Sequence, residues 1–303
     1  MIHSWFVIAN PVSGNKKLSK KWKEIEQLLN EKNIDFFVAF TTHSKHEIEL
    51  VHTAIQQGYR NIISVGGDGT LHHVVNGIMT QRYVKTSDIT VGVIPLGTGN
   101  DWIKTYNMPN NVANSINLIH HKKTILQDIG HLQLTNTSAF FNNVAGIGYD
   151  GYVVNKLNKL KRFGPIAYLL SGIAGLLLYK KTIFTIEVNN LSIETKCLMT
   201  LFGICKYSAG GMQLTDYKNT TDGLFDITIA KNLALIDLIR NIKKLYDGLI
   251  INHKKVETHL SNTLLITPKY AKIQPFIQAD GELIGTGKVT ATIIHKALRF
   301  VIP

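Results

Sequence analysis

Hydrophobic positions in the first 125 residues alternate between short β-branched runs and longer stretches with helical spacing. Apolar runs of strand length between helical stretches are typical of buried strands in a parallel sheet. The expected strands are 4–9, 34–40, 62–65 and 89–94, and the expected helices are 16–31, 44–57, 70–81 and 112–121. Strand–helix units of this kind predict right-handed crossovers and an α/β domain with helices on both faces of a parallel sheet.

The pattern changes near residue 126, where helical periodicity gives way to short alternating strands. One amphipathic helix, 235–250, interrupts them, and Asn189-Asn190 is typical of a hairpin turn. The expected strands are 139–144, 182–188, 193–204, 225–230, 256–266, 271–278, 288–294 and 298–302. This half of the chain therefore predicts a mainly antiparallel β domain, either a sandwich or a barrel.

The stretch from Asn61 to Asn76 joins an apolar strand to a helix through the loop Gly66-Gly-Asp68-Gly-Thr70, with Thr70 as the expected N-cap. Glycine lets a loop backbone approach a ligand, and free N–H groups at a helix N-terminus favour an anion. A carboxylate such as Asp68 is repelled by phosphates unless a divalent cation bridges them or it acts as an acid or base. A metal-assisted nucleotide site is one interpretation, and a tight turn in which Asp68 caps backbone amides is the other.

Two further strands end in loops of the same kind. Asn10-Pro-Val-Ser-Gly14 follows the first strand, and Pro95-Leu-Gly-Thr-Gly-Asn-Asp101 follows the fourth. In open α/β sheets, ligands bind beyond the carboxyl ends of the strands. We therefore expect the three loops to converge on one edge of the sheet and to form one site there.

Composition narrows the class of protein. The chain has 303 residues, a formal net charge of +12, and 45% hydrophobic and 18% charged residues, which are globular values and argue against disorder. The charge favours anionic partners such as nucleotides, nucleic acid or a membrane, although a Lys-rich background explains it equally well. Cys197 and Cys205 lack a CxxC spacing, which indicates a reducing compartment and argues against a disulfide framework. The histidines show no ligand spacing with cysteines or acids and are expected at the surface or at helix flanks.

An almost wholly apolar run, 163–179, lies between basic residues on both sides. It is shorter than the roughly 20 apolar residues of a membrane-spanning helix and contains Gly, Pro and Ser. We expect a buried or surface-lying helix, which either docks on an anionic membrane or packs in the core with its basic end in solvent. The protein is accordingly expected to be cytoplasmic and peripheral to the membrane.

Five motifs occur in order along the chain: NPVSG (10–14), GGDGT (66–70), PLGTGND (95–101), NNVAGIGYD (142–150) and ADGE (279–282). Together they resemble the diacylglycerol kinase catalytic domain family, the bacterial soluble lipid kinases related to sphingosine kinases. GGDGT alone is shared with NAD kinases and phosphofructokinases, whereas its combination with PLGTGND and ADGE is specific to the lipid kinases.

The resemblance implies two domains with the active site in the cleft between them. The first is a nucleotide-binding domain like that of phosphofructokinase or NAD kinase, residues 1–125, completed by a last strand in 296–303. The second is a β-sandwich domain for the lipid substrate, residues 126–295.

The resemblance also implies which residues bind ATP, all of them in or near the three loops. The expected contacts are Asn10, Pro11, Val12, Ser13, Gly14, Thr41, Gly66, Gly67, Asp68, Gly69, Thr70, Leu71, His72, Thr98 and Asn100. Thr42 matches the family position as well as Thr41 does.

Phosphoryl transfer needs charge neutralisation, in-line positioning and a group that takes the proton of the acceptor hydroxyl. Asp68 and Asp101 each lie in a Gly-rich loop, where their oxygens could hold Mg²⁺ together with water and the phosphates. Asp280 and Glu282 lie at a turn late in the β domain, and the general base is assigned to one of the two without choosing between them. An ordinary hairpin turn is the alternative interpretation of Asp280-Gly281.

Two more carboxylates, Asp128 and Asp150, match family positions and would extend this network, Asp128 as a further metal ligand. Turn formation and backbone capping are the alternatives for both.

A second, structural Mg²⁺ site in this family precedes a D-G-L strand. The matching stretch implies Asp222 as a side-chain ligand, with the carbonyls of Asn219 and Leu224. Relatives commonly carry an acidic residue just before that Asp, where this chain departs with Thr221.

These observations predict an ATP- and Mg²⁺-dependent kinase that phosphorylates a lipid hydroxyl at a membrane surface, with diacylglycerol as the default acceptor. The alternatives are an NAD kinase, which shares the GGDGT loop, and a catalytically inactive regulatory protein that uses its basic surface on membranes. No Asn-Glu pair suited to NAD and no nucleic-acid recognition motif is evident, so nucleic acid is not an expected partner. Relatives can dimerise through the β domain, and a homodimer is the oligomer that this implies.

Overall fold

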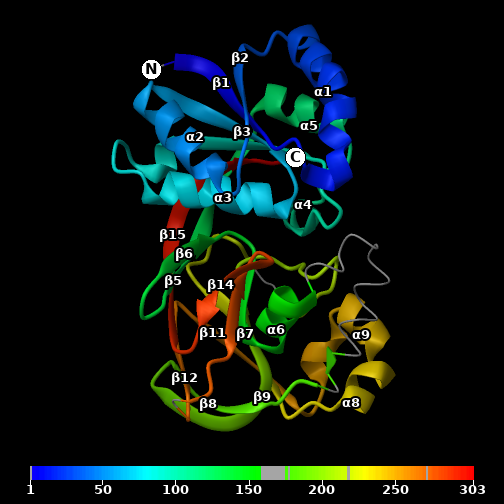
Figure 1. The fold of residues 1–303 in the computed structure, drawn as a ribbon, viewed down its shortest axis with the longest axis vertical. Helices are drawn as coiled ribbons and strands as arrows, with labels where there is room; N and C mark the ends of the chain where they lie inside the picture. The colour runs from blue at the N-terminus through cyan, green and yellow to red at the C-terminus, as the bar shows by residue number, and fades with distance from the viewer. Residues whose placement is uncertain (1, 158–174, 177, 217–218, 271) are drawn as a thin grey trace. The chain divides into compact units, whose positions relative to one another are not determined.

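The computed structural model describes residues 2–157, 175–176, 178–216, 219–270 and 272–303 (Figure 1). The chain forms two compact units: unit 1 comprises Met1–Ile129 with His295–Pro303, and unit 2 comprises Gly130–Ile294. From the sequence, the boundaries between the two domains are predicted at 125–126 and 295–296. Two strands, β5 (Thr124–Gln133) and β15 (Val289–Val301), have residues in both units.

Unit 1 contains a parallel sheet with the strand order β2-β1-β3-β4-β15. Its strands are β1 (Ile2–Ala9), β2 (Phe36–Phe40), β3 (Tyr59–Gly66) and β4 (Thr90–Pro95), and β4 pairs with Arg299 and Phe300 of β15. β-branched residues fill β3 and β4 because both faces of these central strands are buried. Since the strands are parallel, the carboxyl ends of β1, β3 and β4 lie at the same edge of the sheet.

Helices cover both faces of this sheet (Figure 1). α1 (Ser13–Glu31) and α5 (Val112–His121) pack on one face, where Ile25 and Ile116 share a buried cluster with Trp5 of β1. The apolar residues of α5 recur at the spacing that puts them on one side of a helix, which is why this helix matches its expected bounds.

The opposite face carries α2 (His46–Gln56) and α3 (Asp68–Thr80), which contact each other and β3. Gly77 permits their close approach, because a Cβ at this position would lie 2.8 Å from the Cβ of Val51. Two short elements, η1 (Thr86–Asp88) and α4 (Asp101–Thr105), flank β4 along the chain.

Unit 2 is mainly antiparallel, with the strand order β14-β13-β7-β9-β8-β12, and β10 pairs with both β9 and β11. The strands are β6 (Ser138–Phe141), β7 (Val144–Gly148), β8 (Thr182–Val188), β9 (Leu191–Gly203), β10 (Phe225–Lys231), β11 (Val256–Ser261), β12 (Thr263–Pro268), β13 (Phe276–Ala279) and β14 (Glu282–Thr286). The fully buried rings of Phe141, Phe202 and Phe225 pack with centroids 5.7 to 5.9 Å apart in its core.

The helices of unit 2 are short. They are α6 (Tyr149–Leu157), α8 (Leu235–Arg240), α9 (Ile242–Tyr246) and the 3-10 turn η3 (Leu249–Asn252). The prediction of one continuous helix over 235–250 is therefore wrong, because the backbone of Asn241 is not helical, with φ −113° and ψ 19°.

The expected fold class is confirmed, an α/β unit with a parallel sheet and a β-rich antiparallel unit. Asn189 and Asn190 form the predicted turn, since both have positive φ and Val188 pairs with Leu191 across it. The expected strand 256–266 is instead two strands, because Asn262 lies between β11, which pairs with β10, and β12, which pairs with β8 and β15.

Three other strand predictions are wrong in extent, and of the described residues of the expected strand 271–278 only 276–278 lie in a strand, β13. The run 139–144 is divided between β6 and β7, and 288–294 is continuous with 298–302 in the single strand β15. Polar residues at 295–296 interrupt the apolar pattern, so the sequence does not reveal this continuity. In the structure the strand continues through these residues, and the Lys296 N–H donates to Oδ1 of Asp128.

The expected helix at 163–179 lies mostly outside the described residues. Among the residues that the structure does describe, no helix has the length and apolar character needed to cross a membrane.

Candidate active site

The three Gly-rich loops of unit 1 are joined to one another at the carboxyl edge of its sheet. The N–H of Asn10 donates to the carbonyl of Val65 at 3.1 Å, which connects the end of β1 to the end of β3. The N–H of Leu96 donates to the carbonyl of Gly66 at 2.7 Å, which connects β3 to the loop after β4. The expected convergence of these loops is therefore observed.

Two of the loops touch through glycine. A Cβ at Gly97 would lie 2.5 Å from the Cα of Gly67 and 2.6 Å from Oδ1 of Asn100. A Cβ at Gly66 would overlap the Thr70 hydroxyl. These contacts leave no room for a side chain at either position, so glycine is required for packing here as well as for access of a ligand to the backbone.

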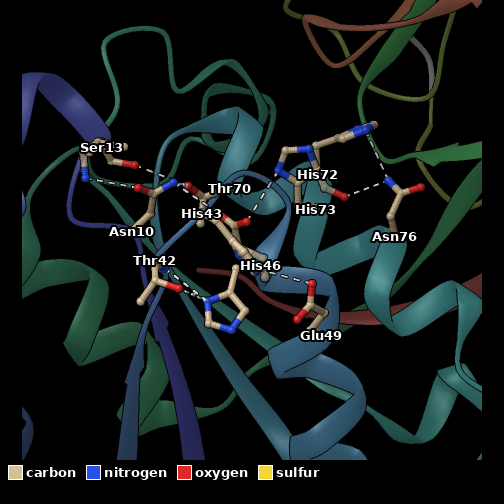
Figure 2. A network of polar contacts seen from close by, with 12 residues as sticks. Asn10, Ser13, Thr42, His43, His46, Glu49, Thr70, His72, His73 and Asn76 are labelled. Atoms are coloured by element: carbon tan, nitrogen blue, oxygen red, sulfur yellow. Dashed lines mark hydrogen bonds and ion pairs between the residues drawn. The ribbon is translucent and has the colours of Figure 1, made fainter.

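A hydrogen-bonded network links the loop after β1 to the loop after β3 (Figure 2). The Asn10 amide Nδ2 donates to Oγ1 of Thr70 at 3.2 Å and to Oε1 of Glu47 at 3.0 Å. The Ser13 hydroxyl lies 3.3 Å from Oγ1 of Thr70. The prediction that Thr70 is the N-cap is wrong, because α3 begins at Asp68 with Gly67 as its N-cap, so the Thr70 hydroxyl turns toward Asn10 and Ser13 instead.

Asp68 and Asp101 are held together by the backbone. Oδ1 of Asp68 accepts the N–H of Asp101 at 2.9 Å and that of Trp102 at 3.4 Å. The Lys104 ammonium donates to Oδ1 of Asp101 at 2.7 Å from one turn further along α4. Sequence reasoning missed Lys104, although its i,i+3 spacing from Asp101 on a helix is the signal that reveals such a pair.

The Oδ2 atoms of both carboxylates lie near Gly99. A Cβ at Gly99 would lie 3.0 Å from Oδ2 of Asp68 and 3.8 Å from Oδ2 of Asp101. Two carboxylate oxygens on either side of a residue without a side chain are suitable ligands for one hydrated divalent cation, because Mg²⁺ binds a few carboxylates and keeps several waters. Asp68 and Asp101 therefore fit the expected metal.

Asp128, the third expected metal ligand, is held by β15. Its Oδ1 accepts the N–H of Lys296 at 2.6 Å and lies 3.0 Å from Nδ1 of His295. Within the described ranges, the oxygens of Asp68, Asp101 and Asp128 do not form a group with all its ligand atoms within 4.8 Å. The expected three-carboxylate cluster is thus not preformed in unit 1.

The other expected ATP contacts differ in what they can offer a ligand. Val12 and Thr98 are exposed, Pro11, Ser13, Gly14 and Gly69 are half-buried, and Thr41, Leu71, His72 and Asn100 are buried. Leu71 faces the core, so only its backbone could meet a nucleotide. Asn100 donates to the Gly97 carbonyl at 2.9 Å and to Oδ1 of Asn110 at 3.0 Å, which makes it a support for the loop.

Thr41 and Thr42 are distinguished by their surroundings. The Thr41 N–H donates to the Ala9 carbonyl at 3.0 Å and its side chain is buried beside the end of β1. The Thr42 N–H donates to Nδ1 of His46 at 3.1 Å and its side chain points to the surface (Figure 2).

The histidines are the least well predicted residues of the site. His72 lies within α3 and is buried at 4% exposure beside Asn76, so the expectation that it lies at the surface or at a helix flank is wrong. Burial lowers the pKa of His73 to about 4, and the nearby His72 and Lys45 lower it further in the same direction. The His73 ring is therefore neutral at pH 7, and its 3.7 Å contact with the buried Glu47 is not an ion pair.

His43, His46 and Glu49 lie with one ligand atom each within 4.8 Å of one another, beside Thr42 (Figure 2). The expectation that no histidine has ligand spacing is wrong for this H-x-x-H-x-x-E stretch. The Thr42 amide already donates to Nδ1 of His46, and His43 Nε2 lies 3.4 Å from Glu49 Oε1. The group could hold a transition metal, but its exposed side chains are also satisfied by these contacts alone.

In unit 2, Asp280 has the role of a hairpin residue. Asp280 and Gly281 both have positive φ and form the two-residue turn between β13 and β14. Both Asp280 carboxylate oxygens accept backbone N–H groups, Oδ2 from Asn142 at 3.2 Å and Oδ1 from Asn143 at 3.0 Å. The hairpin interpretation of Asp280-Gly281 is therefore correct.

Glu282 is the first residue of β14 and is half-buried. Among the described residues, its carboxylate makes no hydrogen bond or ion pair, in contrast to that of Asp280. Asp150 lies at the start of α6, where Oδ2 accepts the Gln278 amide at 3.0 Å. Its complete burial raises the pKa of the Asp150 carboxyl to about 7.

The stretch expected to bind a structural metal forms a tight turn. Oδ1 of Asn219 accepts the N–H and hydroxyl of Thr221, and Oδ1 of Asp222 accepts the N–H of Leu224 at 3.0 Å. Self-contained turns of this kind form without a metal. The ligand assignment of Asn219, Asp222 and Leu224 stays a prediction.

Two family models match this chain, one on each half. The diacylglycerol kinase catalytic domain matches residues 4–132, and the YegS C-terminal NAD kinase beta sandwich-like domain matches residues 143–302. The chain belongs to the diacylglycerol kinase family of lipid kinases. Its first match contains all three loops of the unit 1 site, and its second contains Asp280 and Glu282.

Similar proteins carry the same family name. The chain is 28% identical over 291 residues to a diacylglycerol kinase of Staphylococcus haemolyticus, covering 95% of this chain and 84% of that protein. It is 27% identical over 291 residues to a diacylglycerol kinase of Staphylococcus aureus strain MRSA252, covering 95% and 88%. A crystal structure of a diacylglycerol kinase from Bacillus anthracis has the same fold, with a TM-score of 0.74 at 18% identity, covering 99% of this chain and 97% of that one.

Proposed function

We propose that this kinase transfers the γ-phosphoryl group of ATP to a lipid hydroxyl, most simply that of a diacylglycerol, in a Mg²⁺-dependent reaction at a membrane surface. The observation that carries the proposal is the fixed Asp68–Asp101 pair beside the joined Gly-rich loops. Two carboxylates beside an anion-binding loop are useful only if a cation lies between them and the phosphates. The names of the staphylococcal relatives support the choice of diacylglycerol.

The loop after β3 would bind the phosphates. The N–H groups at the start of α3 are not used within the helix, and the helix dipole adds positive potential there. Thr70, Asn10 and Ser13 form one hydrogen-bonded set, so a phosphate bound by one of them is positioned by all three.

Asp68 and Asp101 would hold the metal. The ion would supply charge neutralisation for the transferred phosphoryl group. The Asp101 N–H fixes the orientation of the Asp68 carboxylate, and Lys104 fixes that of Asp101, so neither side chain has to be ordered when the nucleotide binds.

Glu282 would take the proton of the acceptor hydroxyl. A general base needs a free oxygen, and both oxygens of Asp280 are bonded to backbone N–H groups, whereas the Glu282 carboxylate has no such bonds among the described residues. Asp280 would instead hold the hairpin that carries Glu282.

The test is transfer of radiolabelled phosphate from ATP to a panel of lipids in mixed micelles with Mg²⁺, with NAD as a soluble acceptor. Asp68→Ala and Glu282→Ala would be compared with Asp88→Ala, which changes an exposed carboxylate in η1. Label in one lipid class, lost in the first two variants only, is the expected result. Label in NAD would identify an NAD kinase, and no label in any acceptor despite ATP binding would favour a regulatory protein.

A further inference from the structure

Unit 2 presents an apolar surface on two consecutive short helices, which we name the α8–α9 face. It consists of Ile236 and Ile239 of α8, Tyr246 of α9 and Leu249 of η3, which are exposed by 49, 48, 38 and 51%. Large apolar side chains are scattered singly over most soluble proteins, but four within fourteen positions need an explanation. In Figure 1 the two helices follow one another at the outer edge of unit 2.

The same helices bury a different set of residues, so the α8–α9 face is not a poorly packed core. Leu238 packs against a cluster around Tyr149 and Leu198, and Leu245 packs with Ile250 against a second cluster. These helices therefore have two apolar sides, and only one is used within unit 2. A helix that is apolar on both sides is typical of one that contacts something else as well.

Hydrogen bonds fix the helices in this orientation. Oδ2 of Asp237 accepts the Ala234 N–H at 2.8 Å and the Lys255 ammonium, which ties the start of α8 to the residue before β11. The backbone N–H and the side-chain amide of Gln213 donate to the carbonyls of Leu245 and Tyr246 at 2.7 and 2.6 Å, which ties down the end of α9. The outward side chains are thus presented by a preformed scaffold.

Positive charge surrounds this apolar set. Arg240, Lys243, Lys244 and Lys254 are exposed, and no ion pair of these four is seen in the described part of the chain. Asp237 is neutralised by Lys255, which leaves Asp247 as the single exposed acid between 235 and 254. Burial lowers the pKa of Lys181 nearby, and Lys196 and Lys255 lower it further, while Asp237 raises it.

We propose that the α8–α9 face docks this kinase on an anionic lipid bilayer, with the four apolar side chains in the headgroup region and the basic side chains on anionic headgroups. Apolar residues flanked by lysine and arginine on a helix are typical of interfacial binding, whereas a second copy of this chain would bring like charges together. Nucleic acid would leave the apolar side chains without a partner. The inference rests on the proposed lipid substrate, and it names the surface by which the enzyme would reach it.

Docking through α8 and α9 has a specific consequence for activity. A lipid acceptor in a bilayer is confined to two dimensions, so an enzyme held at the surface meets it at a high effective concentration. An acceptor delivered in uncharged detergent micelles would not need the basic residues. The α8–α9 face should therefore matter for vesicle substrates and not for phosphoryl transfer itself.

The test is sedimentation of the full-length protein with vesicles, without ATP. Vesicles of phosphatidylcholine alone are compared with vesicles of equal parts phosphatidylcholine and phosphatidylglycerol. The variants are the pair Ile236→Ser with Ile239→Ser and the pair Lys243→Glu with Lys244→Glu. Matched controls are Leu191→Ser, which removes an exposed apolar residue of the β8–β9 hairpin, and Lys20→Glu with Lys23→Glu on α1.

We expect the unchanged protein and the controls to sediment with anionic vesicles and not with neutral ones. Each basic residue near an anionic surface contributes roughly fivefold to binding, so the Lys243/Lys244 pair should weaken it by at least about 25-fold. The isoleucine pair should weaken it by about tenfold or more. Both pairs should keep the activity of the unchanged protein toward a short-chain acceptor in neutral micelles.

Three outcomes would overturn the proposal: no sedimentation of the unchanged protein with anionic vesicles, sedimentation of both variant pairs equal to that of the unchanged protein, or a variant pair that only shifts a monomer–dimer equilibrium in analytical ultracentrifugation. The last would assign the face to a second copy. If vesicle binding is lost in the variants but the unchanged protein phosphorylates no lipid, the docking inference stands and the proposed reaction fails.

Discussion

Gly67 and Gly97, which belong to loops that follow different strands, pack backbone against backbone, and a Cβ added at Gly67 would lie 3.0 Å from the Gly97 Cα. A Cβ at Gly97 would approach the Gly67 Cα to 2.5 Å. This contact sets the distance between the loop that carries Asp68 and the loop that carries Asp101. The geometry of the carboxylate pair therefore depends on two residues that have no functional group.

Gly97→Ala should separate the two loops. We expect a loss of about 2 kcal/mol in the free energy of unfolding, because the added carbon has backbone atoms on one side and Asn100 on the other. Affinity for a non-hydrolysable ATP analogue should fall at least about tenfold, measured by calorimetry. Gly210→Ala is the control, since it adds a Cβ in open space at a positive φ and should cost roughly 1 kcal/mol without changing nucleotide affinity.

Lys104→Met should lower kcat about tenfold, because Asp101 would lose the cation that orients its carboxylate. Lys104→Arg should restore most of the activity, since it keeps the charge within reach. Lys123→Met removes an exposed lysine outside the site and should have no effect. Equal activity of the Met and unchanged proteins over a Mg²⁺ titration would show that Lys104 does not position Asp101.

Asp280→Asn should lower stability, whereas Glu282→Gln should lower activity. Asn at 280 would direct an amide NH₂ at the N–H of Asn142 or Asn143. The free energy of unfolding, measured in urea, should therefore fall by about 1–3 kcal/mol. Glu282→Gln should leave stability unchanged and lower kcat at least about 100-fold, because the acceptor hydroxyl would lose its base. An unchanged kcat in Glu282→Gln would exclude Glu282 as the base.

Stability should depend on pH through two groups of opposite sign. The pKa of His73 is lowered from 6.5 to about 4, so the folded state binds fewer protons than the unfolded state between these values, and stability is lost as pH falls. This loss amounts to about 3 kcal/mol at most. The pKa of Asp150 is raised from 3.8 to about 7, so its contribution is lost instead as pH rises through that interval.

Urea denaturation between pH 4.5 and 7.5, at about half-unit steps, would separate the two groups. His73→Gln should make stability fall more steeply with rising pH than in the unchanged protein, because the contribution of His73, which opposes that of Asp150, is then absent. Asp150→Asn should reverse the slope so that stability rises with pH. Parallel curves for all three proteins would mean that neither group has a pKa in the folded state that differs from its pKa in the unfolded chain.

Local rules predicted the elements that depend on few residues. The turn Asn189-Asn190 follows from the tolerance of asparagine for positive φ, and the helix 112–121 follows from its apolar spacing. The convergence of the three loops follows from the parallel order of the strands alone. The family resemblance was specific because its motifs occur at separate points of both halves of the chain.

The errors concern residues whose role depends on distant partners. Thr70 is a residue type that is common at N-caps, but Asn10 and Ser13 lie across from it and bind its hydroxyl. His72 is polar yet buried, because its helix packs with that side inward. Whether Asp280 or Glu282 is free to act as a base depends on the N–H groups of Asn142 and Asn143, more than a hundred residues away in sequence.

The participation of β15 in unit 1 has a consequence for the order in which the protein folds during synthesis. β4 lies at the edge of a growing sheet until Arg299 and Phe300 pair with it, and the Phe300 ring packs against Trp102, next to Asp101, with centroids 4.7 Å apart. The ribosome makes all of unit 2 before these residues emerge. We therefore expect the site of Asp68 and Asp101 to complete its packing only after unit 2 has been translated, and a nascent chain stalled within unit 2 would hold an unfinished form of the proposed nucleotide site.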